Sequence, residues 1–266
     1  MVRAKIEKIS SLNNPKVKLW YHLKSKKGRE ETGLYLIEGY KLVEEAVLFK
    51  KIESLIIEEG TDIPERIFHD EKNRDFPIIE VSAGIIKKLS DTKAPQGIIA
   101  IIKKETGNVD DLIAKNNSFL LIDEIQDPGN FGTIIRSADA AGIGVIILGK
   151  GSVELHNPKV IRASMGSVFH LPVVEADLQE ILIKLKEKGI YIIGTSPYAE
   201  KKYFEIDLKK PVAVLVGNEA NGLAGDRINS VDDMVSIPLI GNAESLNVAT
   251  ATTLILYERV RQLYFL

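Results

Sequence analysis

The chain has 266 residues, of which 45% are hydrophobic and 27% are charged, a composition typical of a globular protein in water. It contains no cysteine, which excludes disulfide bonds, thiolate metal sites and cysteine nucleophiles, and its four histidines (His22, His69, His156 and His170) lack the spacing of metal ligands, which predicts surface or packing roles and no metal site. The net charge of −2 does not by itself indicate a nucleic-acid partner. Because the sequence shows neither a signal peptide nor a long apolar run, we expect a cytoplasmic protein that does not span a membrane.

The first 30 residues are far more basic than the rest of the chain. Only Glu7 and Glu30 offset their positive charge. Such an arm can follow the phosphate backbone of a nucleic acid, while a solvated helix face is an equally open alternative. The basic side chains are Arg3, Lys5, Lys8, Lys16, Lys18, Lys24, Lys26, Lys27 and Arg29.

Residues 1–104 predict a small α/β domain. A helix is expected over 13–27, opened by an Asn cap with Pro15 in the first helical position. Strands are predicted at 34–39, 52–59, 76–82 and 96–104, with helices at 40–50 and 83–90. The polar segment 105–117 is rich in Gly, Asn and Asp and is interpreted as a linker.

Residues 118–266 predict a second, larger domain, in line with about 150 residues per domain. Short, mostly apolar runs alternate with helical segments, which favours a parallel sheet covered by helices on both faces. Strands are expected at 119–125, 145–149, 191–196, 212–217 and 233–239, and helices at 131–141, 157–169, 177–189 and 245–266.

The segment 120–142 joins an apolar strand to an Asp-Pro-Gly-Asn turn and a short helix. Residues Phe131, Ile134, Ile135 and Ala138 form an apolar stripe at helical spacing, and Arg136 lies off that stripe. Gly142 is expected at the helix end. A functional arginine is one interpretation, and a surface pair between Arg136 and Asp139 is the alternative.

The segment 212–225 is a strand followed by a glycine-rich turn. Glu219 occupies the place where a dinucleotide-binding turn needs a glycine, and its carboxylate would repel a pyrophosphate. The turn therefore suits a ligand that is neutral or cationic at that point, or one that bears hydroxyl groups.

Two further segments carry candidate residues. In 236–258, Ser245 or Asn247 can cap a helix, and a serine nucleophile is poorly supported because neither a histidine partner nor a GxSxG motif accompanies it. In 156–173, Arg162 lies on a short helix, where a phosphate contact and a solvent-facing role are equally open.

Taken together, these stretches resemble the SpoU/TrmH family of RNA ribose methyltransferases, within the SPOUT superfamily. The arrangement of Asn130, Gly132 and Arg136 is similar to the family's first motif, "LVGNEANGL" to the second and "IPLIGNAESLNVATA" to the third. "NPKVIRASMGSVFHLPV" is also similar to family members, and "GLYLIEGYKLVEEA" with "APQGIIAI" looks like the family's substrate-binding domain. Ala249 departs from the pattern, since the family often has Ser there.

The resemblance implies S-adenosyl-L-methionine as the methyl donor, a ribose 2′-hydroxyl as the acceptor, a C-terminal trefoil knot and a homodimer. It implies catalytic roles for Arg136, Asn130, Glu219, Ser245 and Asn247, and cofactor contacts at Thr195, Gly217, Asn218, Ile237 and Leu246. We expect Arg136 to bind the substrate phosphate and stabilise the developing alkoxide, because a guanidinium stays protonated in proteins. The family's own proposal is that this arginine accepts the proton. For RNA binding we expect Lys24, Lys26, Lys27, Arg29 and Arg162.

Three alternatives stay open. The substrate can be ribosomal RNA or transfer RNA. The two-domain layout and the basic arm favour ribosomal RNA, and 23S rRNA is the expected target. The protein can also be an RNA-binding protein without activity on the same fold. A dinucleotide-dependent enzyme is disfavoured by Glu219 in the glycine-rich turn.

Overall fold

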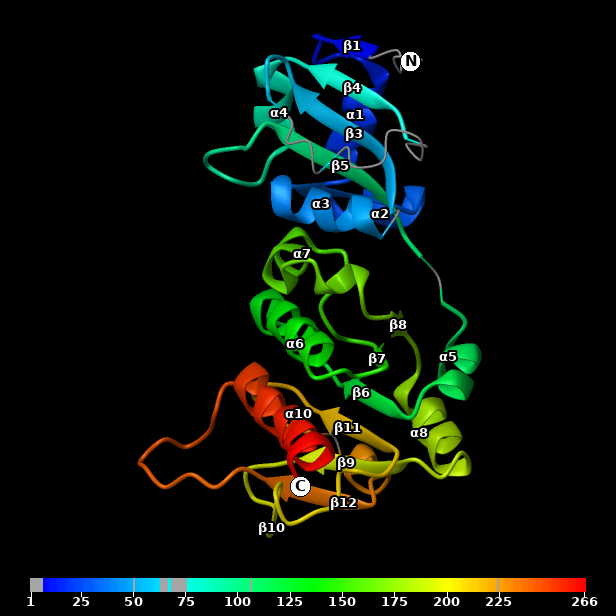
Figure 1. Cartoon of the computed structure of the whole chain (residues 1–266), viewed down its shortest axis with the longest axis vertical. Helices are drawn as coiled ribbons and strands as arrows, with labels where there is room; N and C mark the ends of the chain where they lie inside the picture. The colour runs from blue at the N-terminus through cyan, green and yellow to red at the C-terminus, as the bar shows by residue number, and fades with distance from the viewer. Residues whose placement is uncertain (1–6, 50, 63–66, 68–75, 106, 224) are drawn as a thin grey trace. The chain divides into compact units, whose positions relative to one another are not determined.

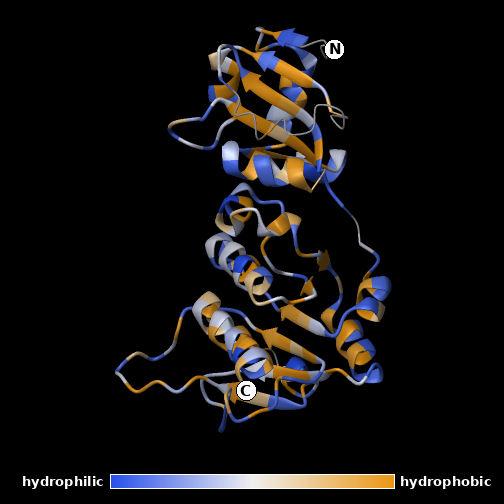
Figure 2. Cartoon of the chain, viewed as in Figure 1, coloured by the Kyte–Doolittle hydropathy of each residue, from blue (hydrophilic) through white to orange (hydrophobic). Residues whose placement is uncertain are grey.

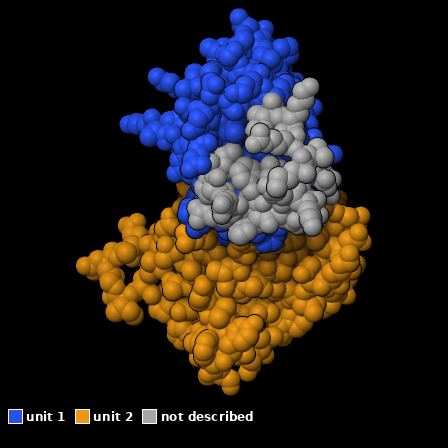
Figure 3. Space-filling view, turned by 45° about the horizontal axis from the view of Figure 1, so that its top comes forward, with its two compact units in different colours: residues 1–105, 156–169 blue, residues 106–155, 170–266 orange. Residues whose placement is uncertain are grey.

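The computed structural model describes residues 7–49, 51–62, 67, 76–105, 107–223 and 225–266, so Arg3, Lys5 and His69 lie outside the described residues. Two compact units are distinguished (Figure 3): Met1–Glu105 with His156–Phe169, and Thr106–Leu155 with His170–Leu266. The segment His156–Phe169 groups with the first unit although it falls inside the predicted range 118–266, because Ile161 and Phe169 belong to the first unit's hydrophobic core.

The first unit contains, among the described residues, a mixed five-stranded sheet in the order β1-β4-β3-β5-β2 (Figure 1). Strands β1, β4 and β3 are mutually parallel, and β5 runs antiparallel to both β3 and β2. Strand β1 was not predicted. The strands are β1 (Glu7–Ile9), β2 (Leu34–Glu38), β3 (Ile52–Glu58), β4 (Ile78–Val81) and β5 (Ile98–Lys103). The helical segments are α1 (Pro15–His22), α2 (Lys26–Thr32), α3 (Tyr40–Leu48), α4 (Ala83–Leu89), α7 (Pro158–Ser164) and the 3₁₀ turn η2 (Ser167–Phe169).

Strand β5 shows how both faces of this sheet are buried. Ile98, Ala100 and Ile102 join the core that includes α3, while Ile99 and Ile101 join the core beneath α1 and α4. Alternate side chains of a strand point to opposite faces, so a continuous apolar run supplies both cores. Figure 2 shows this strand almost entirely in the hydrophobic colour.

The second unit contains, over the part of it that is described, a seven-stranded sheet in the order β10-β12-β9-β11-β6-β7-β8. Every strand pairing in it is parallel, which confirms the predicted α/β class. The trefoil knot implied by the resemblance stays a prediction. The strands are β6 (Ser118–Ile122), β7 (Val145–Leu148), β8 (Val173–Glu175), β9 (Tyr191–Thr195), β10 (Lys201–Lys202), β11 (Val212–Val216) and β12 (Asp233–Ser236). The helices are α5 (Val109–Lys115), α6 (Pro128–Ala140), α8 (Leu178–Glu187), α9 (Gly225–Ile228) and α10 (Val248–Phe265).

The segment 105–117, predicted as a linker, contains helix α5. Asn108 caps it by accepting hydrogen bonds from the backbone N–H groups of Asp110 and Asp111, at 2.9 and 3.3 Å. Ile113 packs into the core of the second unit. One buried side chain in a polar stretch is too weak a periodic signal to separate a short helix from a loop.

The order of the strands changes direction at β6. From β6 the sheet continues through β7 and β8 on one side and through β11 and β9 on the other. Val216 at the end of β11 pairs with Ile122 at the end of β6, so the loops after these two strands leave the sheet together. In open parallel sheets, ligands bind at the carboxyl edge where the order changes direction.

Helix α10 lies beside α6 (Figure 1), and Ser137 of α6 shares a hydrogen bond of 2.7 Å with Thr253 of α10. The buried amide of Gln262 anchors the other end of α10. It donates to the carbonyl of Ile206 at 3.0 Å and accepts from the backbone N–H of Leu208 at 2.8 Å. Within the described ranges, no helix is long and apolar enough to cross a membrane.

Replacing Gln262 with Leu should lower the free energy of unfolding by about 2 to 4 kcal/mol, because two buried backbone groups lose their partner. Gln179→Leu on the exposed face of α8 is the matched control and should change stability by less than about 0.5 kcal/mol. Urea unfolding of both variants measures the difference. Equal stabilities would show that water replaces the amide of Gln262.

Candidate active site

A cleft of about 530 Å³ opens at the carboxyl edge of the second unit's sheet, a size within the range of small-molecule sites. The loops after β9, β11 and β12 line it, as does the first part of α10. Its described lining residues include Glu219 and Glu244 but no lysine or arginine. All five predicted cofactor contacts line this one cleft: Thr195, Gly217, Asn218, Ile237 and Leu246.

The turn after β11 needs glycine at its first position. A Cβ atom on Gly217 would lie 2.4 Å from the carbonyl oxygen of Gly222, which is too close for any other residue. Asn218 closes the turn: its Oδ1 accepts from the backbone N–H groups of Ala220 and Asn221, and its Nδ2 donates to the carbonyl of Glu124 at 2.9 Å. Asn218 was predicted as a cofactor contact, yet the polar atoms of its side chain are engaged in shaping the turn.

A chain of hydrogen bonds connects the three motifs singled out in the sequence. Asn247 Nδ2 donates to Asn130 Oδ1 at 2.8 Å, and Asn130 Nδ2 donates to Glu219 Oε1 at 3.1 Å. The structure thus brings Asn130 together with Glu219 and Asn247, which lie 89 and 117 residues away from it in sequence. Asn247 is also the cap of α10, as one of the two sequence alternatives expected, since its Oδ1 accepts from the N–H groups of Ala249 and Thr250.

Glu219 is an acceptor throughout this arrangement. Besides Asn130, its carboxylate accepts from the backbone N–H groups of Gln126 and Asp127, both at 3.3 Å. Partial burial alone would raise the pKa of Glu219, but the bonds from Asn130 and the backbone outweigh it and hold the pKa below its usual value. Glu219 is therefore an anion at neutral pH.

Arg136 lies on the exposed side of α6, while Phe131, Ile134, Ile135 and Ala138 are fully buried, as their spacing predicted. The alternative pairing of Arg136 with Asp139 is absent, because Asp139 pairs with His170 at 2.9 Å. Within the described part of the chain, the guanidinium has no hydrogen bond or ion pair. It is not among the residues that line the cleft.

Ser245 lies in the exposed loop before α10 and lines the cleft. Asp123 and Tyr198, which follow strands β6 and β9, were not singled out from the sequence. Asp123, directly after β6, is buried, which raises its pKa, and the guanidinium of Arg227 at 3.5 Å partly offsets that effect. Tyr198 lines the cleft and is 92% exposed. An acid and an aromatic residue just past strand ends are signals that could have identified Asp123 and Tyr198.

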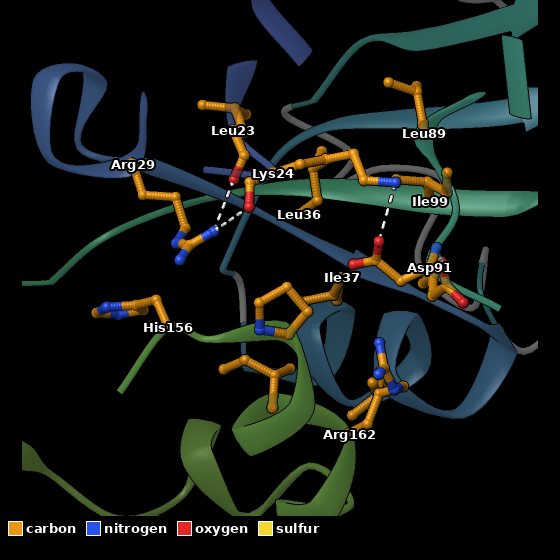
Figure 4. Close-up of a pocket in the computed structure, with 14 residues that line it drawn as sticks. Leu23, Lys24, Arg29, Leu36, Ile37, Leu89, Asp91, Ile99, His156 and Arg162 are labelled. Atoms are coloured by element: carbon orange, nitrogen blue, oxygen red, sulfur yellow. Dashed lines mark hydrogen bonds and ion pairs between the residues drawn. The ribbon is translucent and has the colours of Figure 1, made fainter. Parts of the chain in front are cut away.

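The predicted RNA-binding residues fall into different environments. Arg29 is only 3% exposed and donates to the carbonyls of Leu23 and Lys24, as Figure 4 shows, so it holds the α1–α2 turn together and is not on the surface where an RNA contact was expected. Lys24 is half-buried and pairs with Asp91 at 2.9 Å. Lys26 and Lys27 are exposed and pair with Glu30 and Glu31 one helical turn away. Arg162 is half-buried and lines the small pocket of Figure 4.

Comparison with known proteins identifies two matching families. Residues 117–257 match the model of the SpoU rRNA Methylase family, and residues 14–100 match that of the MRM3-like substrate binding domain. The chain is 36% identical over 253 residues to the 23S rRNA (guanosine(2553)-2′-O)-methyltransferase RlmP of Bacillus subtilis, covering 95% of this chain and 98% of that protein. It is 33% identical over 192 residues to the 23S rRNA (uridine(2479)-2′-O)-methyltransferase of Streptomyces viridochromogenes, covering 69% and 67% of the two chains.

Two solved structures resemble this one closely. The AdoMet-bound rRNA methyltransferase from Sinorhizobium meliloti has a TM-score of 0.85 and 32% identity, covering 97% of this chain and 98% of that chain. The SpoU methyltransferase AviRb from Streptomyces viridochromogenes, in complex with AdoMet, has a TM-score of 0.85 and 28% identity, covering 94% and 98%.

The lowered pKa of Glu219 leads to a pH-dependent stability. A carboxyl group whose pKa is depressed by folding contributes stability above its unfolded value, given as 4.5 for glutamate, and that contribution is lost as the pH falls through the folded value. Wild type should therefore exceed Glu219→Gln in melting temperature at pH 7, and the gap should shrink below pH 4.5. A gap that stays constant across this range of pH would contradict the role of Glu219 as a charged acceptor.

Proposed function

This chain belongs to the SpoU rRNA Methylase family, and we propose that it methylates a ribose 2′-hydroxyl of 23S ribosomal RNA. The chain is an RNA methyltransferase that uses S-adenosyl-L-methionine as its methyl donor. The observation that carries the proposal is the chain of hydrogen bonds from Asn247 through Asn130 to Glu219, which ties the three motifs to one cleft. A cytoplasmic location is consistent with a ribosomal RNA substrate.

The residues of the cleft fit the proposed donor. When bound, S-adenosyl-L-methionine supplies an electrophilic methyl group on a sulfonium cation. Glu219 and Glu244 make the cleft wall anionic, and Gly217 allows the tight turn that carries Glu219. Basic side chains that would attract a pyrophosphate are absent from the described lining. Apolar contacts from Ile237 and Leu246 suit an adenosyl group.

We assign to Arg136 the electrostatic part of the reaction. The ribose hydroxyl must lose its proton as it attacks, so a fixed positive charge beside the oxygen stabilises the charge that develops there. Arg136 is exposed and unpaired among the described residues, and its guanidinium is therefore available to a phosphate and a ribose oxygen. Because a guanidinium stays protonated, another group or water takes the proton.

Glu219 is better suited to positioning than to proton transfer. Hydrogen bonds from Asn130 and from backbone N–H groups hold its pKa down, so it is a weak base near neutral pH. Its carboxylate fixes the amide of Asn130, and Asn247 fixes the other end of that amide. We propose that the Asn130 amide and Ser245, which lies in the cleft wall, orient the ribose for in-line attack.

The substrate proposal rests on the relatives and on the first domain. We propose residues 1–104 as the RNA-binding domain, 105–117 as the connection and 118–266 as the catalytic domain, which the two family matches support. The test is to incubate the protein and S-adenosyl-L-methionine with unmodified 23S rRNA and with total tRNA, and then to map 2′-O-methyl groups. A site in tRNA alone would favour the tRNA alternative, and no site in either would favour an inactive RNA-binding protein.

Arg136→Ala should lower the rate of methyl transfer by about 10² or more, the effect of removing one donor to a developing oxyanion. Cofactor affinity by calorimetry and the melting temperature should stay close to wild type, because the side chain is exposed and outside the cleft. A large loss of stability with activity retained would make Arg136 a structural residue.

We also propose that the chain acts as a homodimer formed through α10. Leu254 and Tyr257 are 38% and 46% exposed and lie one helical turn apart, and Tyr264 and Phe265 extend the apolar surface towards the chain end. A second copy facing the same surface would cover it symmetrically. Because α6 lies beside α10, such a dimer also brings Arg136 near the partner's cleft, which accounts for its absence from the residues that line the cleft of its own chain.

Replacing Leu254 and Tyr257 with Asp should reduce the mass from twice 29.5 kDa to that of one chain and abolish activity. Ile255, next to Leu254, is buried in its own unit and is unsuitable for this test. Ile183→Asp, at an exposed apolar position of α8, is the matched control and should leave mass and activity unchanged. Light scattering and a methylation assay provide the readouts.

A mixing experiment separates a shared site from a merely stabilising interface. Arg136→Ala and Glu219→Ala chains are each expected to be inactive, but mixed dimers contain one intact site if the two residues act across the interface. An equal mixture should then recover about a quarter of wild-type activity. Mixtures without activity would place both residues in the site of one chain.

A further inference from the structure

Tyr21 presents an aromatic ring on the outer surface of the first unit. It is the last residue but one of α1, is 50% exposed, and faces α4. The ammonium groups of Lys88 and Lys24 lie 5.1 and 5.9 Å from the ring centroid, within the range of cation–π contact. The buried neighbour Trp20 packs instead into the core beneath α1 and α4, so α1 directs one aromatic residue inward and one outward.

The lysines on this surface differ from those expected to bind RNA. Lys26 and Lys27 each have a glutamate partner one turn away. Lys87, beside Lys88 on α4, and Lys18, one turn before Tyr21 on α1, have no ion pair in the described ranges. Lys24 is the exception on this surface, since it pairs with Asp91. Lys88, which has no carboxylate partner in the described ranges, therefore lies at the exposed ring of Tyr21, and Lys18 and Lys87 are neighbours on α1 and α4.

We propose that Tyr21 is a stacking platform for an unpaired base of the RNA substrate, with Lys18, Lys87 and Lys88 as contacts to the flanking phosphates. The proposal rests on the proposed function and identifies where the first domain holds single-stranded RNA. An aromatic ring stacks on any base, while lysines neutralise the backbone on either side of it. Lys24 is held in place by Asp91 and the carbonyl of Ser90, whereas Lys88 has no carboxylate partner in the described ranges, so a base displaces Lys88 from the ring and its ammonium group reaches a phosphate.

The proposal selects single-stranded over duplex RNA. In a duplex the bases are stacked on one another and unavailable to a side chain, whereas bases in loops and bulges are free to stack on an aromatic ring. The same lysines would bind either form through its phosphates. Loss of the ring should therefore affect single-stranded RNA much more than duplex RNA.

The first experiment measures binding of a fluorescent oligoadenylate and of an RNA duplex of equal length by anisotropy. Tyr21→Leu, which keeps an apolar side chain without a ring, should bind the oligoadenylate about tenfold more weakly and the duplex as wild type does. Tyr21→Phe should bind both as wild type does. Equal binding of the oligoadenylate by wild type and Tyr21→Leu would overturn the stacking site.

The second experiment compares two double variants with the same change of charge. Lys87→Gln with Lys88→Gln should weaken oligoadenylate binding and reduce the slope of its salt dependence, because fewer counterions are released. Lys26→Gln with Lys27→Gln should change both by much less, since these lysines already have glutamate partners. A larger effect from Lys26 and Lys27 would move the RNA path to α2 and away from Tyr21.

Cofactor titration and a methyl-transfer assay separate failure of the proposed function from failure of the stacking site. If wild type transfers no methyl group to any RNA, the proposed function fails whatever Tyr21 does. If wild type methylates 23S rRNA and Tyr21→Leu does so with unchanged KM, the stacking site fails while the function stands. A raised KM with unchanged cofactor affinity is the expected result.

Discussion

The site depends on one amide, that of Asn130, being held at both ends. Its oxygen accepts from Asn247 and its nitrogen donates to Glu219, so neither motif can shift without breaking a hydrogen bond to Asn130. Glu219 in turn accepts from the backbone before α6, which fixes where that helix begins. These hydrogen bonds hold the three loops in fixed positions relative to one another. The cleft that the loops line keeps its shape because the polar groups are hydrogen-bonded to one another.

The parallel sheet makes this convergence possible. Strands β6 and β11 end in register, and β9 and β12 end beside them, so the loops that follow emerge at one edge. Each of these strands is short and β6 and β11 are fully buried, so few of their side chains are available for chemistry, and Thr195 at the end of β9 reaches the cleft. Most of the polar residues of the site therefore lie in the loops, where side chains reach both solvent and ligand.

Much of this arrangement was predictable from local signals. The stripe from Phe131 to Ala138 and the cap of α1 at Asn14 follow from residue type and spacing alone, and Asn247 was one of two expected caps of α10. The short strands β1, β8 and β10 were missed because three or fewer residues give no period to detect. Arg29 was expected at the surface because it is charged. In the structure its guanidinium donates to two carbonyl groups of the preceding turn, a contact that no sequence pattern indicates. The bond between Asn130 and Glu219 joins residues 89 positions apart, which a single sequence does not reveal.

The double role of Asn247 has a consequence for the dynamics of the protein. The same side chain protects the amides of Ala249 and Thr250 at the start of α10 and holds Asn130 in the site. When the first turn of α10 frays, Asn130 loses a partner at the same moment, so opening of the helix end and disassembly of the site are one event. The hydrogen-exchange rates of those two amides therefore report how often the assembled site comes apart, without any ligand being present.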